Sequence, residues 1–130
     1  SSTTPLGSIE PPFDLVELAL GAGATYVART TTFDFDDLPN RLVEAIQHPG
    51  FAVVEVLSQC PTFYGRSNGL GNAVAMLDYE RDQTAPVEQI TKDDLVGKLP
   101  LGVFRHVECP EYVREYAAAC AASGGTRDRA

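Results

Sequence analysis

Hydrophobic and polar positions near the start of the chain follow helical spacing first and then the pattern of a strand. Apolar residues recur at helical spacing over 13–20, and Asp14 and Glu17 suit the positive end of a helix dipole. The Gly21-Ala22-Gly23 sequence can adopt the left-handed conformation that ends a helix. The β-branched and aromatic stretch 25–29 then predicts a strand.

A second unit repeats this order. Acidic residues open a predicted helix over 34–47, and His48-Pro49-Gly50 ends it. The nearly continuous apolar run 51–57 predicts the most buried strand of the chain, covered on both faces as in a parallel sheet. This alternation predicts an α/β fold with right-handed crossovers. Because two strands are too few to close a parallel sheet, we expect an incomplete sheet with flanking helices.

The pattern after residue 57 is less regular. Residues 58–71 are rich in Pro, Gly, Ser and Asn, which predicts a long loop. Pro100 and Gly102 disfavour a central strand, so the apolar stretch around them is assigned to a sheet edge. The expected elements are a helix over 73–80, a short edge strand over 99–105 and a helix over 112–122.

Composition and charge fit one acidic globular domain. The chain has 130 residues, of which 44% are hydrophobic, and 18 acidic against 10 basic residues give a net charge of −8. We expect residues 1–122 to form the domain and 123–130 a flexible tail. The negative charge disfavours partners that carry phosphate, both nucleic acid and anionic membrane surfaces. The chain has no apolar run near the roughly 20 residues of a membrane-spanning helix, and residues 1–5 do not resemble a signal peptide.

The cysteines indicate a reducing compartment. Cys60, Cys109 and Cys120 form no Cys-x-x-Cys pair, and their odd number leaves at least one thiol unpaired. We therefore expect a cytoplasmic protein. Since His48 and His106 are also far apart in sequence, a complete metal site within this chain is not expected.

Several polar residues could carry chemistry but have simpler structural explanations. The carboxylates in 34–37 could bind a metal, yet helix capping explains them better because the oxygen-ligand loop of a calcium site is missing. Gly69-x-Gly71 begins like a dinucleotide-binding loop but lacks the third glycine and does not directly follow a strand. We interpret His48 as structural, and no sequence feature identifies a catalytic partner for His106.

Glu55 lies inside an apolar strand, where a carboxylate needs a partner. Arg29 on the neighbouring predicted strand can provide it. A structural ion pair is therefore favoured over a catalytic base.

Cys60 is the most informative candidate. It lies just past the carboxyl end of the predicted strand 51–57, where α/β sheets place their sites, and Pro61 fixes the backbone after it. By itself, a lone thiol is an inert packed cysteine about as often as it is a ligand.

Stretches along most of the chain resemble one family. The sequence Thr-Pro-Leu-Gly-Ser-Ile-Glu-Pro-Pro-Phe-Asp over 4–14 resembles the Thr-Pro-x-Gly-x-x-Glu-Pro-Pro-Phe-Asp stretch of 2-oxoacid:ferredoxin oxidoreductase beta subunits. Gln59-Cys60-Pro61-Thr62 most resembles the 2-oxoglutarate branch of that family. Further similar stretches follow in order over 23–31, 50–51, 54–62 and 101–104.

The resemblance implies a thiamine diphosphate-binding fold and an enzyme assembly that decarboxylates a 2-oxoacid oxidatively to acyl-coenzyme A and reduces ferredoxin. The implied cofactors are thiamine diphosphate, magnesium and a 4Fe-4S cluster. The implied partners are the alpha subunit, ferredoxin and the remainder of the beta subunit, in an oligomer. Family members hold the cluster with three cysteines near the N-terminus and a fourth in the loop matching 58–62. Cys60 takes that fourth position, and thiolate suits iron.

The chain also departs from the family. It has no Gly-Asp-Gly motif, no Asn-rich magnesium signature and no N-terminal cysteine set. We therefore expect the C-terminal portion of a beta subunit, inactive alone, with no catalytic or thiamine-binding residue assigned and neither cofactor held. The alternative is a stand-alone, non-catalytic α/β module for assembly or dimerisation through its sheet edge.

Overall fold

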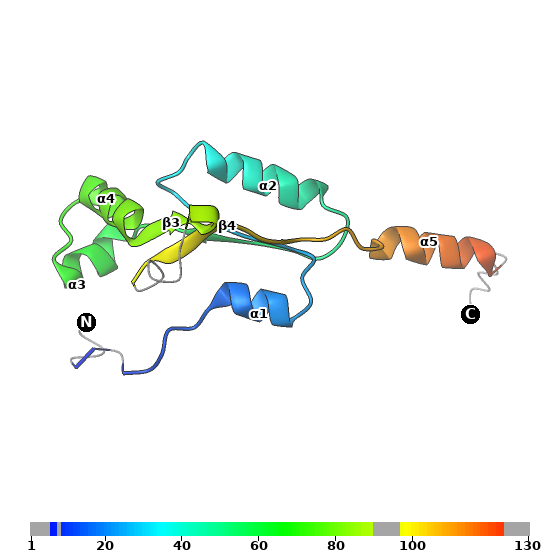
Figure 1. Cartoon of the computed structure of the whole chain (residues 1–130), viewed down its shortest axis with the longest axis horizontal. Coiled ribbons are helices and arrows are strands. Elements are labelled where there is room, and N and C mark those ends of the chain that lie inside the picture. Colours follow the sequence, from blue (N-terminus) through cyan, green and yellow to red (C-terminus); the bar gives the residue numbers. More distant parts are fainter. Residues whose placement is uncertain (1–5, 8, 90–96, 124–130) are drawn as a thin grey trace.

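The structure is a computed structural model that describes residues 6–7, 9–89 and 97–123. Figure 1 shows a sheet with α1 on one face and α2 on the other, α3 and α4 at one end, and α5 extending from the opposite end. The helices are α1 (Leu15–Gly21), α2 (Asp37–Gln47), α3 (Arg66–Asn68), α4 (Ala73–Gln83) and α5 (Tyr112–Ala122), with single turns η1 (Pro61–Gly65) and η2 (Val87–Gln89). The strands are β1 (Tyr26–Thr31), β2 (Ala52–Leu57), β3 (Thr84–Pro86) and β4 (Leu99–His106).

The four strands form a mixed sheet in the order β2-β1-β4-β3. β1 and β2 are parallel, with Tyr26 opposite Ala52 and Thr31 opposite Leu57. β4 runs antiparallel to β1, while β3 pairs parallel to β4. The α/β class, the parallel pair and the flanking helices are confirmed, and the later strand makes the sheet mixed.

β4 differs from its prediction because it lies inside the strand order, so the expected edge position is wrong. Leu99–Leu101 pair with β3, and the strand pairs with β1 from Gly102 onward. Gly102 stands where the pairing partner changes, with φ of +128°, a conformation that favours glycine. Among the described residues Pro100 pairs only with β3, so its missing amide donor is tolerated.

The buried core centres on β1 and not on β2. All six residues of β1 are buried, while β2 is mostly half-buried. The apolar run 51–57 predicted the opposite, because it indicated a strand covered on both sides. In the described sheet β2 has a strand neighbour only in β1, which leaves its other edge open. The main core cluster contains Val16, Ala19, Ala24 and Val27, against which Leu20, Val53 and Phe104 pack.

Regions of low periodicity contain more structure than predicted. The expected loop 58–71 includes η1 and α3, and α4 is longer than the expected helix. β3, a three-residue strand, was not predicted. The expected flexible tail lies, apart from Ser123, outside the described residues. None of the helices in the described residues is both long enough and apolar enough to cross a membrane.

Candidate functional site

Cys60 follows the carboxyl end of β2, as predicted, and begins the turn η1. Cys60 is exposed, and the next residue, Pro61, occupies the first position of the turn. Proline suits that position because its fixed φ fits a helical turn and the missing amide would have no partner there. The amide of Gly65 donates to the carbonyl of Cys60 at 3.0 Å and closes the turn.

The turn also makes the surroundings of the sulfur favourable for an anion. The amides of Tyr64 and Phe63, with that of Thr62, hold the pKa of the Cys60 thiol below its ordinary value. A thiolate is the form of cysteine that binds metals and acts as a nucleophile. The geometry therefore presents an exposed sulfur that favours negative charge.

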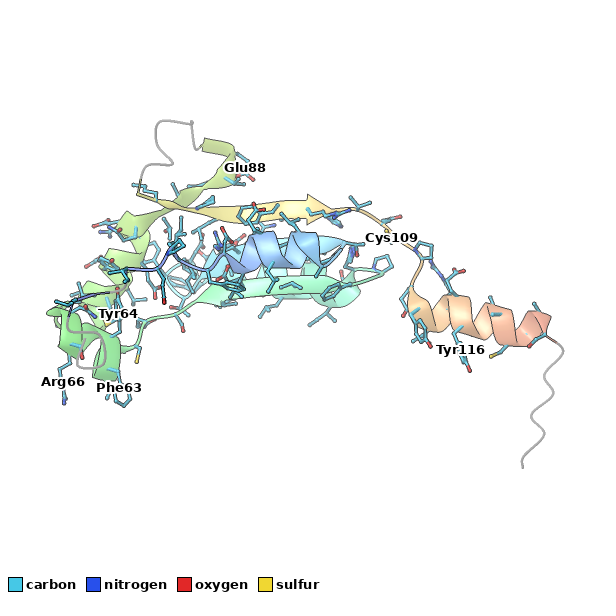
Figure 2. The ribbon with its side chains drawn as sticks, turned by 90° about the horizontal axis from the view of Figure 1, so that it is seen from below. Phe63, Tyr64, Arg66, Glu88, Cys109 and Tyr116 are labelled. Atoms are coloured by element: carbon cyan, nitrogen blue, oxygen red, sulfur yellow. The ribbon has the colours of Figure 1, made fainter. Side chains whose placement is uncertain are left out.

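A cavity of about 340 Å³ adjoins the sulfur. Figure 2 shows Phe63, Tyr64 and Arg66 at the end of the molecule opposite α5. The cavity lies between the end of β2, the Cys60 turn and α4, so three elements would contact a group placed there. Its lining consists of Leu57, Ser58, Gln59, Cys60, Tyr64, Met76, Tyr79 and Glu80.

A hydroxyl at the end of β1 joins two sides of this cavity. Thr32 Oγ1 lies 2.6 Å from Gln59 Oε1 and 3.1 Å from Glu80 Oε2. Burial raises the pKa of Glu80 above its ordinary value, although contacts with Thr32 and the Phe33 amide oppose the shift. Neither Thr32 nor Glu80 was expected at this place from the sequence. The parallel pairing of β1 and β2 could have placed Thr32 beside Gln59, but nothing in the sequence placed Glu80 there.

Gly65 fixes the far end of the turn against α4. It is buried, and a Cβ at this position would lie 2.5 Å from Met76 Sδ. A side chain at residue 65 would therefore require the Met76 thioether to move. The Gly65 end of the Cys60 turn packs directly against α4, while the Gln59 end reaches α4 only through Thr32.

The predicted Arg29–Glu55 ion pair is confirmed. Arg29 Nε lies 2.6 Å from Glu55 Oε2 across the parallel pair, and the guanidinium also reaches Asp14 Oδ1 at 2.7 Å. Arg29 is only 3% exposed and lies over the ring of Phe104. Asp14 in turn accepts the amide of Val16 and caps α1. Glu55 therefore has a structural partner, and the arrangement ties α1 to the sheet.

The two histidines lie together although they are far apart in sequence. His48 is buried, with Nε2 2.8 Å from Thr25 Oγ1, which confirms its structural role. The His106 ring centre lies 5.4 Å from that of His48 and 5.2 Å from that of Tyr26. The cluster sits where β1 begins, at the opposite end of that strand from Thr32. His106 is therefore not isolated, but it is remote from Cys60.

The acidic residues before α2 support its first turn. Asp34 accepts the amide of Asp37, and Asp37 pairs with Arg41 at 2.8 Å, in agreement with the capping interpretation. Gly69 and Gly71 have positive φ and belong to the turn between α3 and α4. In the part of the chain that the structure describes, no three His, Cys, Asp or Glu side chains are grouped as a metal site.

The other two cysteines do not approach Cys60. Cys109 lies between β4 and α5, and Cys120 lies on α5. Figure 2 shows Cys109 beside α5, across the molecule from Tyr64 of the Cys60 turn. Any further thiolate ligand beside Cys60 would have to come from outside the described residues.

Comparisons with known proteins agree on one group of relatives. The family "Thiamine pyrophosphate enzyme, C-terminal TPP binding domain" matches residues 1–56. The chain is 40% identical over 118 residues to 2-oxoglutarate synthase subunit KorB of Methanocaldococcus jannaschii, covering 88% of this chain and 44% of that relative. It is 48% identical over 63 residues to 2-oxoglutarate oxidoreductase subunit KorB of Mycobacterium tuberculosis, covering 48% and 17%.

A solved structure shares the fold. It is 2-oxoglutarate:ferredoxin oxidoreductase from Magnetococcus marinus with 2-oxoglutarate, coenzyme A and succinyl-CoA bound. The TM-score is 0.74 at 30% identity, over 98% of this chain and 45% of that one. This chain thus spans less than half the length of each of these relatives.

Proposed function

Since the chain matches 2-oxoacid:ferredoxin oxidoreductase beta subunits in sequence and fold, we propose that it is the C-terminal part of such a subunit, of the 2-oxoglutarate type. The observation that carries the proposal is the 40% identity over 88% of the chain. The shared fold of the 2-oxoglutarate:ferredoxin oxidoreductase structure supports it. The assembly would decarboxylate 2-oxoglutarate oxidatively, form an acyl-coenzyme A and reduce ferredoxin.

In this proposal the chain itself supplies scaffold and one metal ligand. Bound thiamine diphosphate, with magnesium, supplies the decarboxylation chemistry, and a 4Fe-4S cluster carries electrons to ferredoxin. We assign no residue of this chain to thiamine diphosphate. Three further cysteine ligands and the magnesium site would belong to the rest of the beta subunit.

The surroundings of Cys60 fit a thiolate ligand. Its sulfur is exposed, is not part of a disulfide and favours the anion through the amides of η1. Iron in clusters is held by thiolates, and amides beside a ligating sulfur tune the reduction potential. Cys60 would therefore hold one iron, and the turn 61–65 would shield that side of the cluster.

The relatives are subunits of larger assemblies, so the proposed partners are the alpha subunit, ferredoxin and the remainder of the beta subunit. A cytoplasmic location follows from the proposal and from the sequence-based expectation of a reducing compartment. Alone, the chain would be inactive and would hold neither cofactor.

The test is Cys60→Ser in the complete beta subunit, assembled with its partners. Serine is close in size, but its hard oxygen replaces thiolate poorly on iron. Iron per subunit, visible absorbance and coenzyme A-dependent reduction of a dye by 2-oxoglutarate should fall together. Cys109→Ser and Cys120→Ser are matched controls that should change none of the three.

Two results would contradict the proposal. An unchanged cluster in the Cys60→Ser subunit would show that Cys60 is an ordinary thiol and not an iron ligand. An assembly that holds a cluster but does not oxidise any 2-oxoacid would rule out the proposed oxidative decarboxylation. A non-catalytic module would instead dimerise and show neither iron nor activity.

A further inference from the structure

We propose that Glu80, acting through Thr32 and Gln59, is a positioning residue that fixes the Cys60 turn and so sets the place of the sulfur. The inference deepens the proposed function and rests on it for its biological meaning. Its structural content concerns only residues of this chain and can be tested without the cluster.

The contacts form a continuous chain from α4 to the residue before Cys60. Glu80 Oε2 lies 3.1 Å from Thr32 Oγ1, which lies 2.6 Å from Gln59 Oε1. A threonine hydroxyl has one hydrogen, so it can donate to only one of these oxygens. Because rotation of the Gln59 amide exchanges its oxygen and its NH2 group, the hydroxyl can accept from Gln59 and donate to the Glu80 carboxylate.

The position of Thr32 makes it a firm attachment for the loop. Its own amide donates to the Leu57 carbonyl at 2.9 Å, which extends the pairing of β1 and β2 to the point where the loop begins. The hydroxyl therefore projects from the buried sheet toward Gln59. Glu80 adds α4 as a second attachment, because its carboxyl contacts the same hydroxyl.

These attachments matter because the position of the sulfur depends on the orientation of η1. The amide of Gly65 donates to the Cys60 carbonyl at 3.0 Å, so Cys60 and the turn move together. Gly65 against Met76 fixes the far end of the turn, and Gln59 fixes the near end. Loss of the near attachment would let the sulfur move from this position.

The test uses this chain with Thr32→Val and Glu80→Ala, each compared with the conservative Glu80→Gln. The first readout is alkylation of each cysteine by iodoacetamide at neutral pH, resolved by mass spectrometry. The second is hydrogen exchange of the peptide containing 58–65. In Thr32→Val and Glu80→Ala, the ratio of Cys60 to Cys120 alkylation rates should fall, and the peptide should exchange faster. Glu80→Gln keeps a side chain that can form a hydrogen bond with the Thr32 hydroxyl. The alkylation ratio and the exchange rate should therefore equal those of the parent chain.

Thr84→Val is the matched control for simple loosening of α4. The Thr84 hydroxyl donates to the backbone carbonyl of Glu80 at 2.8 Å but does not contact Gln59. This variant should lose stability and keep the Cys60 ratio. Parental Cys60 reactivity in folded Thr32→Val and Glu80→Ala, or an equal change in Thr84→Val, would overturn the inference. A complete subunit without a cluster would defeat the proposed function and leave these results standing.

Discussion

At the scale of single residues, the sequence predicted pairs only where strand register determined them. Arg29 and Glu55 could be matched because they fall at equivalent positions of two adjacent strands. Thr32 and Glu80, 48 residues apart, could not be matched because the chain returns to the end of the sheet at α4 through a region without clear periodicity. The proximity of His106 to Tyr26 was missed for another reason: the two residues are opposite each other in the β1–β4 pair, and β4 had been assigned to a sheet edge.

Arg29→Leu should be among the most destabilising substitutions of the chain. Arg29 is 3% exposed and pairs with both Asp14 and Glu55, so its removal leaves two carboxylates without this partner, and that of Glu55 is half-buried. We expect a loss of about 3–5 kcal/mol in the free energy of unfolding, measured by urea denaturation. Arg81→Leu removes a guanidinium with two exposed ion pairs, which solvent screens, and should cost much less than Arg29→Leu. Equal effects of the two variants would show that the Arg29 cluster contributes little.

Tyr26 should give the protein a stability loss at alkaline pH. Burial, together with its hydrogen bond to Glu44, raises the pKa of Tyr26 to about 12 from an ordinary 10. A raised pKa means that the stabilisation is complete below pH 10 and is lost as the pH rises through about 12. Tyr26→Phe should be less stable at pH 8 by about 1.5–3 kcal/mol, because it loses a bond to a charged group.

The Tyr26→Phe variant should also show a smaller decrease in stability between pH 10 and 12 than the parent. Denaturation at a series of pH values measures this difference. Tyr112→Phe, at a residue 76% exposed, should follow the parent curve. Identical alkaline curves for the parent and Tyr26→Phe would exclude Tyr26 as the titrating group.

At the scale of elements, local periodicity was sufficient for the first two helix–strand units and for the later elements of eight residues or more, since α4, β4 and α5 were each predicted to within three residues at either end. The α1, β1, α2 and β2 segments each have a clear apolar pattern and a polar or glycine boundary. The η1, α3 and β3 segments have three to five residues each, too few to show a period. β4 was assigned to an edge because Pro100 and Gly102 were treated alone, whereas the strand changes partners between them.

Hydrogen exchange should show whether the amides of the buried strand β1 or those of the more apolar strand β2 are better protected. β1 has strands on both sides and no exposed residue, whereas β2 pairs only with β1 in the described sheet. Amides of 26–31 should therefore exchange most slowly, and those of 52–57 should exchange faster in the isolated chain. Slower exchange in β2 than in β1 would mean that another strand covers β2 in solution.

At the scale of the whole molecule, α1, the sheet and α2 form three layers, and in the described sheet the layer of strands stops at β2. A groove of about 450 Å³ lies between α1 and β2, lined mainly by apolar side chains such as Leu18 and Phe51. On the other face, α2 exposes Val43 and Ile46, the latter by 83%. Soluble sheets usually protect an edge with Lys, Pro or a bulge, and β2 has none of these within Ala52–Leu57. The open, apolar side of β2 agrees with the incomplete sheet that was predicted from the sequence.

The isolated chain should therefore self-associate through the β2 edge. The apolar area around β2 favours association, while the net charge of −8 opposes it, so the species should be small oligomers that grow with salt. Val56→Lys places a charge on a residue of β2 that is 38% exposed and should shift sedimentation toward the monomer. Val113→Lys makes the same change on α5 and should leave the distribution unaltered, because α5 extends away from the sheet in Figure 1. A parent chain that stays monomeric at high concentration and binds no apolar dye would contradict self-association through the β2 edge. If only Val113→Lys shifted the distribution toward the monomer, the association would be assigned to α5.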